Sequence, residues 1–588
     1  MGKFLLGLLT GAILVVLIGV IGFFAIASLR SKPVTIADGS TLILHLWGEV
    51  PEKPPVEFSI PGLGGRSSIT VENVWSMLRR AASDSRIKAV IFEPEEAGVG
   101  WGTMQEIRAD LENFRKSGKP LVAFLKSPSL RDYYMATAAS KIYMPPSDML
   151  NLKGIGFQMM YFKNTLDKLG VQVDVEHAGA YKDYGDQFTR ASMSPETKEV
   201  MNSLADGLYG DLVDVIARGR GKDAAAVKAI IDNGPFLAKQ AKANGLVDDL
   251  RYEDEVFGEV KTTLHQTSLK KTSEHDYSRV TDASAGLGGS GANTEQIAFV
   301  VGEGTIARGD DADTSGLQSG VFDRMLERVG NDSTIKAAII RINSPGGEVV
   351  ASDDMWRAMN QLMAKKPIVI SMADEAASGG YYMAMTGSPI LAYPGTITGS
   401  IGVVFGKPNL HGLYDKLGIT KDTVSRGKYA MIDSDYSSLT PDERAKLKEG
   451  IDATYDDFLD KVSKARKKPV SEIAPVAQGR VWLGNQAKDK GLVDDMGGID
   501  AAVRKARELA KIPASSHVNL VLYPGKKSLL EYIMQAAGSG GDDELDSLAA
   551  IASRAGFEPL RAALRDSRVR VWMHGGMMRM TPFSFDFR

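Results

Sequence analysis

Ser378, Gly379 and Gly380 form a tripeptide whose residue types could support nucleophilic chemistry. An apolar run that predicts a strand (367–371) precedes it, and a helical pattern begins near Ser378. A serine at the start of a helix faces backbone N–H groups and the positive end of the helix dipole, while glycines let the backbone approach a substrate closely. Capping a helix is the common alternative role for serine, so the tripeptide alone leaves both roles open.

A second glycine pair, Gly346 and Gly347, follows a predicted strand (337–342) and precedes a predicted helix (349–363). Their backbone N–H groups, together with that of Gly379, could stabilise an oxyanion, and one such donor typically contributes about 10²–10³ in rate. A tight turn between a strand and a helix would use the same two glycines.

Most of the chain is duplicated. Four segments recur in the same order: 84–91 as 332–339, 133–136 as 381–384, 179–182 as 427–430, and 245–249 as 491–495. A period this long indicates two homologous domains rather than a solenoid, whose repeats span about 20–50 residues. Strand and helix patterns alternate within each copy, which predicts an α/β fold with a parallel sheet covered by helices.

The first copy lacks the groups that could do chemistry in the second. Leu130, Arg131 and Asp132 stand in place of the Ser-Gly-Gly tripeptide, and segment 93–98 replaces the glycine turn. The loss of both features together indicates that they serve one catalytic function in the second copy.

A nucleophilic serine needs a base, and none of the seven histidines is evidently placed to serve. A lysine can act instead if its pKa falls from about 10.4 toward 7, which burial favours. Lys182 in the first copy aligns with Ala430 in the second, so one copy keeps a serine and the other keeps a lysine. This complementary loss predicts an active site shared by the two copies. The alternatives are a solvated surface role for Lys182 and a rival base at Lys428.

Composition narrows the class of protein. The 588 residues suggest two to four domains, and the net charge of −3 gives no case for a nucleic-acid partner. The absence of cysteine excludes disulfides, thiolate metal sites and cysteine nucleophiles. The histidines lack zinc-ligand spacing, so we expect no metal and no other cofactor.

Residues 4–29 carry no charged side chain, and about 20 apolar residues are enough to cross a bilayer. They predict an N-terminal transmembrane helix within a membrane anchor at 1–32. A cleavable signal peptide is the alternative, because Ala25-Ile26-Ala27 resembles a cleavage site. The flanking charges do not fix the orientation, but the very short leading segment favours a large domain outside the cytoplasm.

The rest of the chain divides by its repeats. We expect a first repeat at 33–265, a linker at 266–295, a second repeat at 296–510 and a C-terminal extension at 511–588. The polar, glycine-rich composition of the linker predicts flexibility. In the extension we expect a helix near 529–537 and an arginine-rich end. This segment could be a docked helix with a basic tail, or it could contact the membrane or take part in assembly.

The motifs together resemble bacterial signal peptide peptidase A, also called protease IV, in its long, duplicated form. The resemblance covers about residues 1–510 and includes the membrane anchor. Its motifs are Ile-Lys-Ala-x-Ile-x-Arg-x-Asn-Ser-Pro-Gly-Gly (335–347), Ala-Ser-Gly-Gly-Tyr-Tyr (377–382), Thr-Gly-Ser-Ile-Gly (398–402) and Gly-Arg-Val-Trp-Leu-Gly-x-x-Ala-x-x-x-Gly-Leu-Val-Asp (479–494).

This resemblance implies two tandem ClpP/crotonase-like domains and a serine endopeptidase with a Ser-Lys dyad. The family's nucleophile corresponds to Ser378, its base to Lys182, and a serine that hydrogen-bonds the lysine to Ser400. Short members carry both groups in one domain, with the lysine at the position of Ala430. The resemblance also implies a cyclic homotetramer at the bacterial inner membrane, with the catalytic domain in the periplasm. Its hydrophobic peptide substrates would be released signal peptides, cut within their apolar core.

Three other interpretations stay open from the sequence. A crotonase-type acyl-CoA enzyme would use the fold and the oxyanion hole without needing Ser378, Lys182 or a membrane anchor. A catalytically inactive membrane scaffold would not need the retained serine and lysine. A protease facing the cytosol would need the opposite topology.

Overall fold

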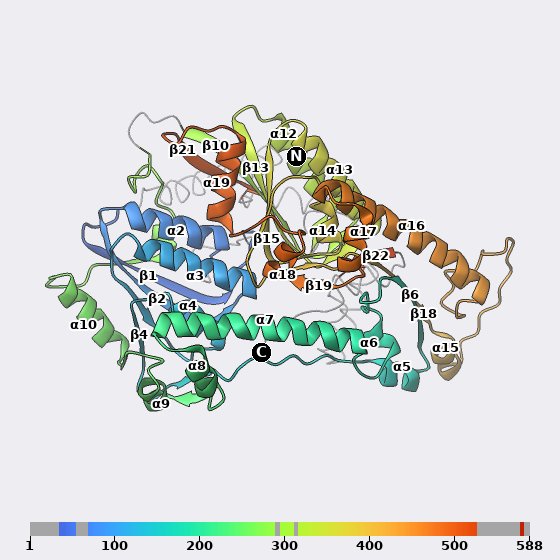
Figure 1. The fold of residues 1–588 in the computed structure, drawn as a ribbon, viewed down its shortest axis with the longest axis horizontal. Helices are drawn as coiled ribbons and strands as arrows, with labels where there is room; N and C mark the ends of the chain where they lie inside the picture. Colours follow the sequence, from blue (N-terminus) through green and yellow to red (C-terminus); the bar gives the residue numbers. More distant parts are fainter. Residues whose placement is uncertain (1–34, 55–68, 289–293, 311–315, 526–576, 581–588) are drawn as a thin grey trace, which may run out of the picture.

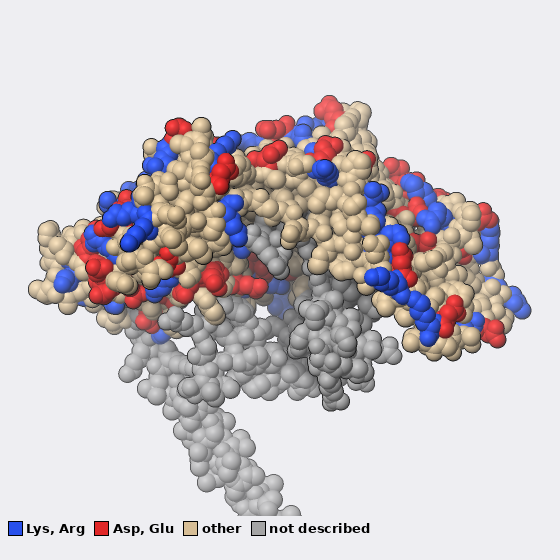
Figure 2. Space-filling view, turned by 90° about the horizontal axis from the view of Figure 1, so that it is seen from below, with Lys and Arg blue, Asp and Glu red and all other residues tan. Residues whose placement is uncertain are grey.

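The computed structural model describes residues 35–54, 69–288, 294–310, 316–525 and 577–580. Each copy contributes one mainly parallel sheet, and a third sheet combines strands from both copies with one from the C-terminal extension (Figure 1). Basic and acidic side chains are interspersed over the described residues on the face in Figure 2, in keeping with the small net charge of −3.

The first sheet has the strand order β8-β4-β3-β2-β1-β9, and all neighbouring strands run parallel. Its strands are β1 (Ser40–Glu49), β2 (Ile87–Gly98), β3 (Leu121–Phe124), β4 (Lys141–Met144), β8 (Asp249–Leu250) and β9 (Lys271–Ser273). The helices of this copy are α2 (Val71–Ser83), α3 (Trp101–Arg115), α4 (Leu130–Ala136), α5 (Lys163–Leu169), α6 (Asp186–Thr189), α7 (Pro195–Arg220), α8 (Ala224–Ile231), α9 (Ala238–Ala243), α10 (Glu253–Thr263) and α11 (Glu274–Tyr277). Strands β5 (Met149–Leu150) and β7 (Phe236–Leu237) form a separate antiparallel pair.

The second sheet has the order β19-β17-β15-β13-β10-β21. In addition, β16 pairs with β15, and β20 pairs with β16. Its strands are β10 (Thr294–Glu303), β13 (Ile335–Ser344), β15 (Ile368–Ala377), β16 (Ile390–Ala392), β17 (Ile397–Gly399), β19 (Val481–Leu483), β20 (Asp495–Met496) and β21 (His517–Tyr523). The helices are α12 (Ser319–Asn331), α13 (Val349–Met363), α14 (Gly379–Met383), α15 (His411–Leu417), α16 (Pro441–Arg466), α17 (Val470–Ile473), η1 (Ala474–Val476), α18 (Gly484–Asp489) and α19 (Ile499–Leu509). Strands β13 and β15 are buried along most of their length, as expected for parallel strands covered on both faces.

Matching hydrogen bonds in the two copies support the duplication. In the first copy, the hydroxyl of Tyr133 donates to the Leu246 carbonyl at 2.8 Å. In the second, the hydroxyl of Tyr381 donates to the Leu492 carbonyl at the same distance. Because these tyrosines align in the repeat, the helix after β3 and the helix after β15 are anchored in the same way.

The third sheet joins the two copies directly. Its order is β12-β11-β14-β22-β18-β6, where β6 (Gln172–Ala178) belongs to the first copy. The other strands are β11 (Ile306–Ala307), β12 (Leu317–Gln318), β14 (Gly346–Glu348), β18 (Val403–Asn409) and β22 (Met577–Met580). Strands β6 and β18 pair antiparallel along their full length, from Val403 opposite Ala178 to Asn409 opposite Gln172.

A buried charged cluster also ties the copies together. The guanidinium of Arg341 on β13 donates to Glu52 at 2.6 Å and to Glu106 on α3 at 2.5 Å, and all three side chains are buried. Burial raises the pKa of Glu52 to about 7, against the opposing effect of Arg341. Two carboxyls therefore share one guanidinium, and Glu52 holds a proton over much of the acidic range.

The predicted strands of the second copy are present and longer than expected, and one of its two predicted helices has the expected bounds. The strands expected at 297–301, 337–342 and 367–371 appear as β10, β13 and β15, each extended at one or both ends, and the helix expected at 349–363 is α13. The helix expected from Ser378 is short, because α14 spans only Gly379–Met383.

Two regions outside the predicted repeats belong to the sheets. Within the segment predicted as a linker (266–295), β9 pairs with β1 and α11 follows it, so part of this segment completes the first sheet. Within the predicted extension (511–588), β21 pairs with β10 at the edge of the second sheet. Backbone pairing at a sheet edge does not depend on an apolar side-chain pattern, so the composition of these segments did not predict β9 or β21.

No helix among the described residues is long and apolar enough to span a bilayer. The transmembrane helix predicted at 4–29 and the helix predicted near 529–537 lie outside the described residues.

The Glu52 carboxyl makes stability depend on pH. Its folded-state pKa of about 7 lies above its ordinary value of 4.5, so the folded state holds a proton that the unfolded state releases. This carboxyl therefore lowers the free energy of unfolding as the pH rises from about 4.5 to 7, by at most about 3 kcal/mol. We expect Glu52→Gln to flatten this part of the pH profile measured by denaturant unfolding.

The matched control is Glu508→Gln, because Glu508 is exposed and pairs with Lys505 at the surface. This control should keep the wild-type profile. A Glu52→Gln profile that also follows wild type would show that Glu52 does not titrate in this range.

Candidate active site

Lys182 and Ser378, one from each copy, meet inside the protein. The Lys182 Nζ atom lies 2.7 Å from the Ser378 Oγ atom. It also lies 3.0 Å from both the Oγ atom and the carbonyl oxygen of Ser400. All three residues are fully buried, so the contact is shielded from bulk water.

Ser378 lies at the end of β15, immediately before α14, in a strained backbone conformation. Its φ of 53° and ψ of −111° are uncommon for a residue with a side chain. Its N–H donates to the Gly399 carbonyl at 2.8 Å, which ties this turn to β17. Within the described residues its hydroxyl makes no capping bond to α14, so the alternative role as a helix cap is not observed.

Strand pairing between the copies positions Lys182. It follows β6, and β6 pairs with β18 of the second copy. After β6, the Tyr181 N–H donates to the Gln478 carbonyl at 2.8 Å. Gly479 then packs against the Lys182 backbone so closely that an added Cβ would lie 2.5 Å from the Lys182 Cβ. Glycine is required at this position for two reasons. The close contact leaves no room for a Cβ atom, and the φ of +74° disfavours residues that carry a side chain.

Ser400 connects this turn to the lysine. Its N–H donates to the Arg480 carbonyl at 2.7 Å, and the Gly479 N–H donates to the Ile401 carbonyl at 2.7 Å. With a φ of 51°, Ser400 turns both its hydroxyl and its carbonyl oxygen toward Lys182. The segments around 400 and 479, both singled out by the sequence motifs, thus form one support for the amine.

Of the predicted oxyanion donors, Gly379 directly follows Ser378, and the Gly346–Gly347 turn lies against α14. Gly379 is the first residue of α14, where helix geometry leaves the N–H without an intrahelical acceptor. An added Cβ on Gly380 would lie 2.7 Å from the Ser344 carbonyl, so α14 packs directly on the glycine turn. In that turn the Gly346 N–H donates to the Ser344 hydroxyl at 3.2 Å, and Gly347 pairs with β11.

The corresponding part of the first copy is an ordinary helix start. Ser129 caps α4 with a φ of −74°, and Asp132 completes the capping box by accepting from the Ser129 N–H at 2.9 Å. The first copy has therefore exchanged the strained serine for a relaxed cap. A copy that no longer carries a candidate nucleophile can adopt this relaxed conformation.

The rival lysine lies elsewhere. Lys428 is exposed and pairs with Asp442 at 2.8 Å. Ala430, the counterpart of Lys182, lies in the same surface segment after α15. Among the described lysines, Lys182 is thus the one that the structure brings to Ser378.

Sequence reasoning did not identify Asp183, the neighbour of Lys182. This carboxyl is buried and accepts a hydrogen bond from the hydroxyl of Thr197 on α7. Desolvation raises its pKa to about 6. A lone aspartate next to the lysine carried no signal of burial, because the covering helix α7 comes from later in the chain.

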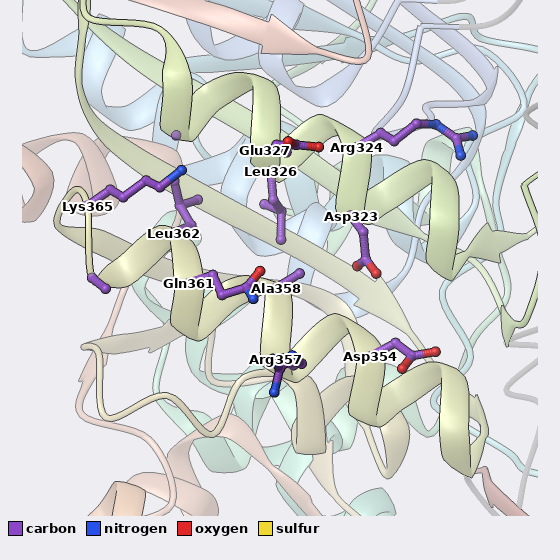
Figure 3. Close-up of a pocket in the computed structure, with 12 residues that line it drawn as sticks. Asp323, Arg324, Leu326, Glu327, Asp354, Arg357, Ala358, Gln361, Leu362 and Lys365 are labelled. Carbon is purple, nitrogen blue, oxygen red and sulfur yellow. The ribbon is translucent and has the colours of Figure 1, made fainter.

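A groove between α12 and α13 lies apart from these residues (Figure 3). Its volume is about 660 Å³, and Asp323 and Asp354 lie on its two sides. Desolvation, followed by the nearby Asp354 charge, raises the pKa of Asp323 to about 6. Lys182, Ser378 and Ser400 are not among its described lining residues, so we do not consider it the active site. The described residues also contain no group of three or more acidic or histidine side chains arranged to hold a metal ion.

A protein-family model matches the chain twice, in agreement with the duplication. The model of Peptidase family S49 matches the chain twice, at residues 113–267 and 360–513. The chain is 34% identical to "Serine protease SPPA, chloroplastic" of Arabidopsis thaliana, covering 86% of this chain and 74% of that protein. It is 32% identical to "Protease 4" of Salmonella typhi, covering 84% and 82%. A structure of a ClpP1 mutant from Listeria monocytogenes matches 35% of this chain and 94% of that one, at 14% identity and a TM-score of 0.21.

The family model matches both copies, and the relatives align over 84–86% of this chain. Together these matches define a serine peptidase with tandem S49 domains. The chain belongs to peptidase family S49, in its duplicated Protease 4 form.

The close contact at Gly479 gives a test of how Lys182 is positioned. Gly479→Ala places a methyl group against the Lys182 backbone, so we expect the amine to shift and peptide hydrolysis to fall about tenfold or more. Gly418→Ala is the matched control, since Gly418 has nearly the same φ of +72° but open space around its Cβ position.

Both variants carry similar backbone strain, but Gly479→Ala adds the overlap with Lys182 and should lose more thermal stability than Gly418→Ala. Only the Gly479 variant should lose kcat. Equal kcat values in the two variants would contradict the positioning role of this turn.

Proposed function

We propose that Ser378 and Lys182 form the Ser-Lys dyad of a serine endopeptidase, in which Lys182 is the general base. The observation that carries the proposal is the 2.7 Å separation of Lys182 Nζ and Ser378 Oγ within a fully buried site. A base must lie within about 2.6–3.2 Å of the atom whose proton it takes, and this separation meets that requirement.

The contacts of the amine support its neutral form. A neutral amine has two N–H donors and one lone pair. The hydroxyl and carbonyl oxygens of Ser400 can accept the two N–H groups, which directs the lone pair at the Ser378 hydroxyl. Burial also disfavours the charged ammonium. Ser400 is therefore a positioning residue that orients the base.

The reaction proceeds through an acyl-enzyme. Lys182 Nζ takes the proton from the Ser378 hydroxyl as Oγ attacks the peptide carbonyl carbon. The tetrahedral intermediate collapses, and the Lys182 ammonium gives its proton to the departing amine. Water then attacks the ester, with Lys182 taking a proton from the water and returning it to Ser378 Oγ as the acid product leaves.

The developing oxyanion would be held by backbone donors. The Gly379 N–H at the start of α14 is one, and the Gly346–Gly347 turn, which packs against α14, supplies the other. The strained backbone at Ser378 supports this arrangement, because it lifts the hydroxyl out of the capping position and toward Lys182.

The substrates we propose are hydrophobic peptides, in particular signal peptides already released from preproteins and cut within their apolar core. The apolar segment 4–29 supports a membrane anchor, with the peptidase domains on the periplasmic side of the inner membrane. We also propose a homotetramer. The dyad itself forms within one chain, so assembly would shape access to the site rather than complete it.

Neither rival function has a specific observation in its favour. A crotonase-type acyl-CoA enzyme or an inactive scaffold gives no reason to keep Ser378 strained and its hydroxyl against a buried lysine.

The nucleophile can be tested by covalent labelling. A fluorophosphonate probe should modify the wild-type protein on Ser378, identified by mass spectrometry of the labelled peptide. Ser378→Ala should remove both the labelling and the hydrolysis of a fluorogenic apolar peptide. Labelling that persists at another serine in this variant would rule out Ser378 as the nucleophile.

The base can be tested with a substitution that keeps the positive charge. Lys182→Arg retains a long cationic side chain that cannot lose its proton, so we expect kcat to fall by about 10²–10⁴-fold. Lys182→Ala should have a comparable effect. Lys428→Ala is the control, and its kcat should equal that of wild type because Lys428 lies at the surface. Loss of activity in the Lys428 variant but not in the Lys182 variants would reverse the assignment.

A further inference from the structure

Asp183, the residue that follows Lys182, receives a chain of hydrogen bonds from the start of α7. The Oγ atom of Ser194, which caps α7, lies 2.7 Å from the Oγ1 atom of Thr197. The Thr197 hydroxyl in turn donates to the Oδ2 atom of Asp183. Because the Thr197 hydroxyl has a single proton, Ser194 is the donor in the first of these bonds. Both hydroxyls thus point their protons toward Asp183, as an ionised carboxylate requires.

This chain of bonds is enclosed in the protein. Ser194, Thr197, Asp183 and Lys182 are all buried, and among the described residues the Oδ1 atom of Asp183 has no hydrogen-bond partner. Burying a carboxylate costs free energy, especially where one of its oxygens makes no hydrogen bond. Helix capping does not explain this cost, because the Ser194 hydroxyl already accepts from the Thr197 N–H at 3.0 Å. We therefore looked for a role of Asp183 that involves its neighbour, the base.

The second copy has lost this arrangement together with the lysine. Met431 stands in the position of Asp183. Glu443 is the third residue of α16, as Thr197 is of α7. The Glu443 carboxylate accepts from the Thr440 N–H at 2.9 Å, which completes an ordinary capping box. Lysine, carboxylate and hydroxyl donor are thus present together in one copy and absent together in the other, which indicates that the three act as a unit.

Several charged and titratable groups surround Asp183. Desolvation raises its pKa to about 6, the carboxylate of Asp186 on α6 acts in the same direction, and Lys182 opposes both. Tyr161 also interacts with Asp183 electrostatically. Three further groups act on Asp186, namely Arg190, His177 and Glu196. At neutral pH the Asp183 carboxyl is therefore ionised, with Lys182 as its adjacent cationic group.

We propose that Asp183 is a positioning residue for the base, which ties the chain beside Lys182 to α7 and whose negative charge stabilises the ammonium that forms on Lys182. This inference rests on the proposed function of the Ser378 site. The proton moves from Ser378 Oγ to Lys182 Nζ, and Asp183 neither gives nor takes it. A fixed negative charge lowers the energy of a nearby developing cation, and the effect is stronger in a buried site than in water.

Asp183→Asn tests the charge, because asparagine has nearly the same size and can still accept from Thr197. Without the charge the ammonium is less stable, so Lys182 loses its proton at lower pH. We expect the midpoint of the acidic limb of the kcat/KM profile to move down by about one pH unit. Lys182 is then also a weaker base, so the plateau of kcat/KM should fall about three- to tenfold. Damage to the fold alone would lower the plateau without moving the midpoint.

Thr197→Val tests the same charge while leaving the carboxyl in place. A carboxylate that loses a hydrogen bond keeps its proton to higher pH, so we expect a smaller shift of the midpoint in the same direction. Asp183→Glu retains the charge, and its midpoint should lie closer to wild type than that of Asp183→Asn. The matched control is Asp460→Asn, since Asp460 pairs with Lys464 at the surface of α16, and its profile should equal that of wild type.

Fluorophosphonate labelling of Ser378 gives a second readout, because its rate also depends on the base. Measured against pH, the second-order rate of labelling should show the same downward shift in Asp183→Asn. If Ser378 of the wild type is not labelled at any pH, the dyad is overturned, and this inference with it. If the wild type is labelled and both Asp183→Asn and Thr197→Val keep its midpoint, the role of Asp183 is overturned while the dyad stands. Should Asp183→Asn not fold, an unchanged midpoint in Thr197→Val alone overturns the role of Asp183.

Discussion

The proposed active site depends on one backbone interaction, the antiparallel pairing of β6 from the first copy with β18 from the second. This pairing brings the end of β6 to the turns around Ser400 and Gly479, which hold the Lys182 amine against Ser378. Without it, the amine and the hydroxyl would belong to separate domains. The buried Arg341 cluster reinforces the same interface, since Glu106 on α3 of the first copy accepts from β13 of the second.

Duplication explains why each copy could lose half of the site. Once the pairing was present, the serine of one copy and the lysine of the other would suffice for the proposed dyad. The remaining positions were then free to relax, as the capped start of α4 and the exposed surface segment around Ala430 show. Ser378 and Ser400, the two serines that contact Lys182, both keep a positive φ.

The sequence indicated the residues of the site better than the contacts that assemble it. Comparing the two copies singled out Ser378 and Lys182 because complementary loss leaves a trace in the aligned repeats. Strand patterns likewise predicted β13 and β15, whose apolar runs are long. The pairing of β6 with β18, the burial of Asp183 under α7 and the return of β22 depend on segments far apart in the chain. No local pattern encodes such contacts, so only the structure could reveal them.

The most direct test of the account is a cross-link between β6 and β18. Gln172 and Asn409 lie opposite each other in this pair, and the natural chain contains no cysteine that could compete. Opposite residues in an antiparallel pair lie about 4.5–5.5 Å apart, within disulfide range. In the double variant Gln172→Cys/Asn409→Cys, the account predicts a disulfide within one chain on non-reducing gels and peptide hydrolysis that survives oxidation. A disulfide that joins two chains, or activity that returns only with reductant, would contradict it.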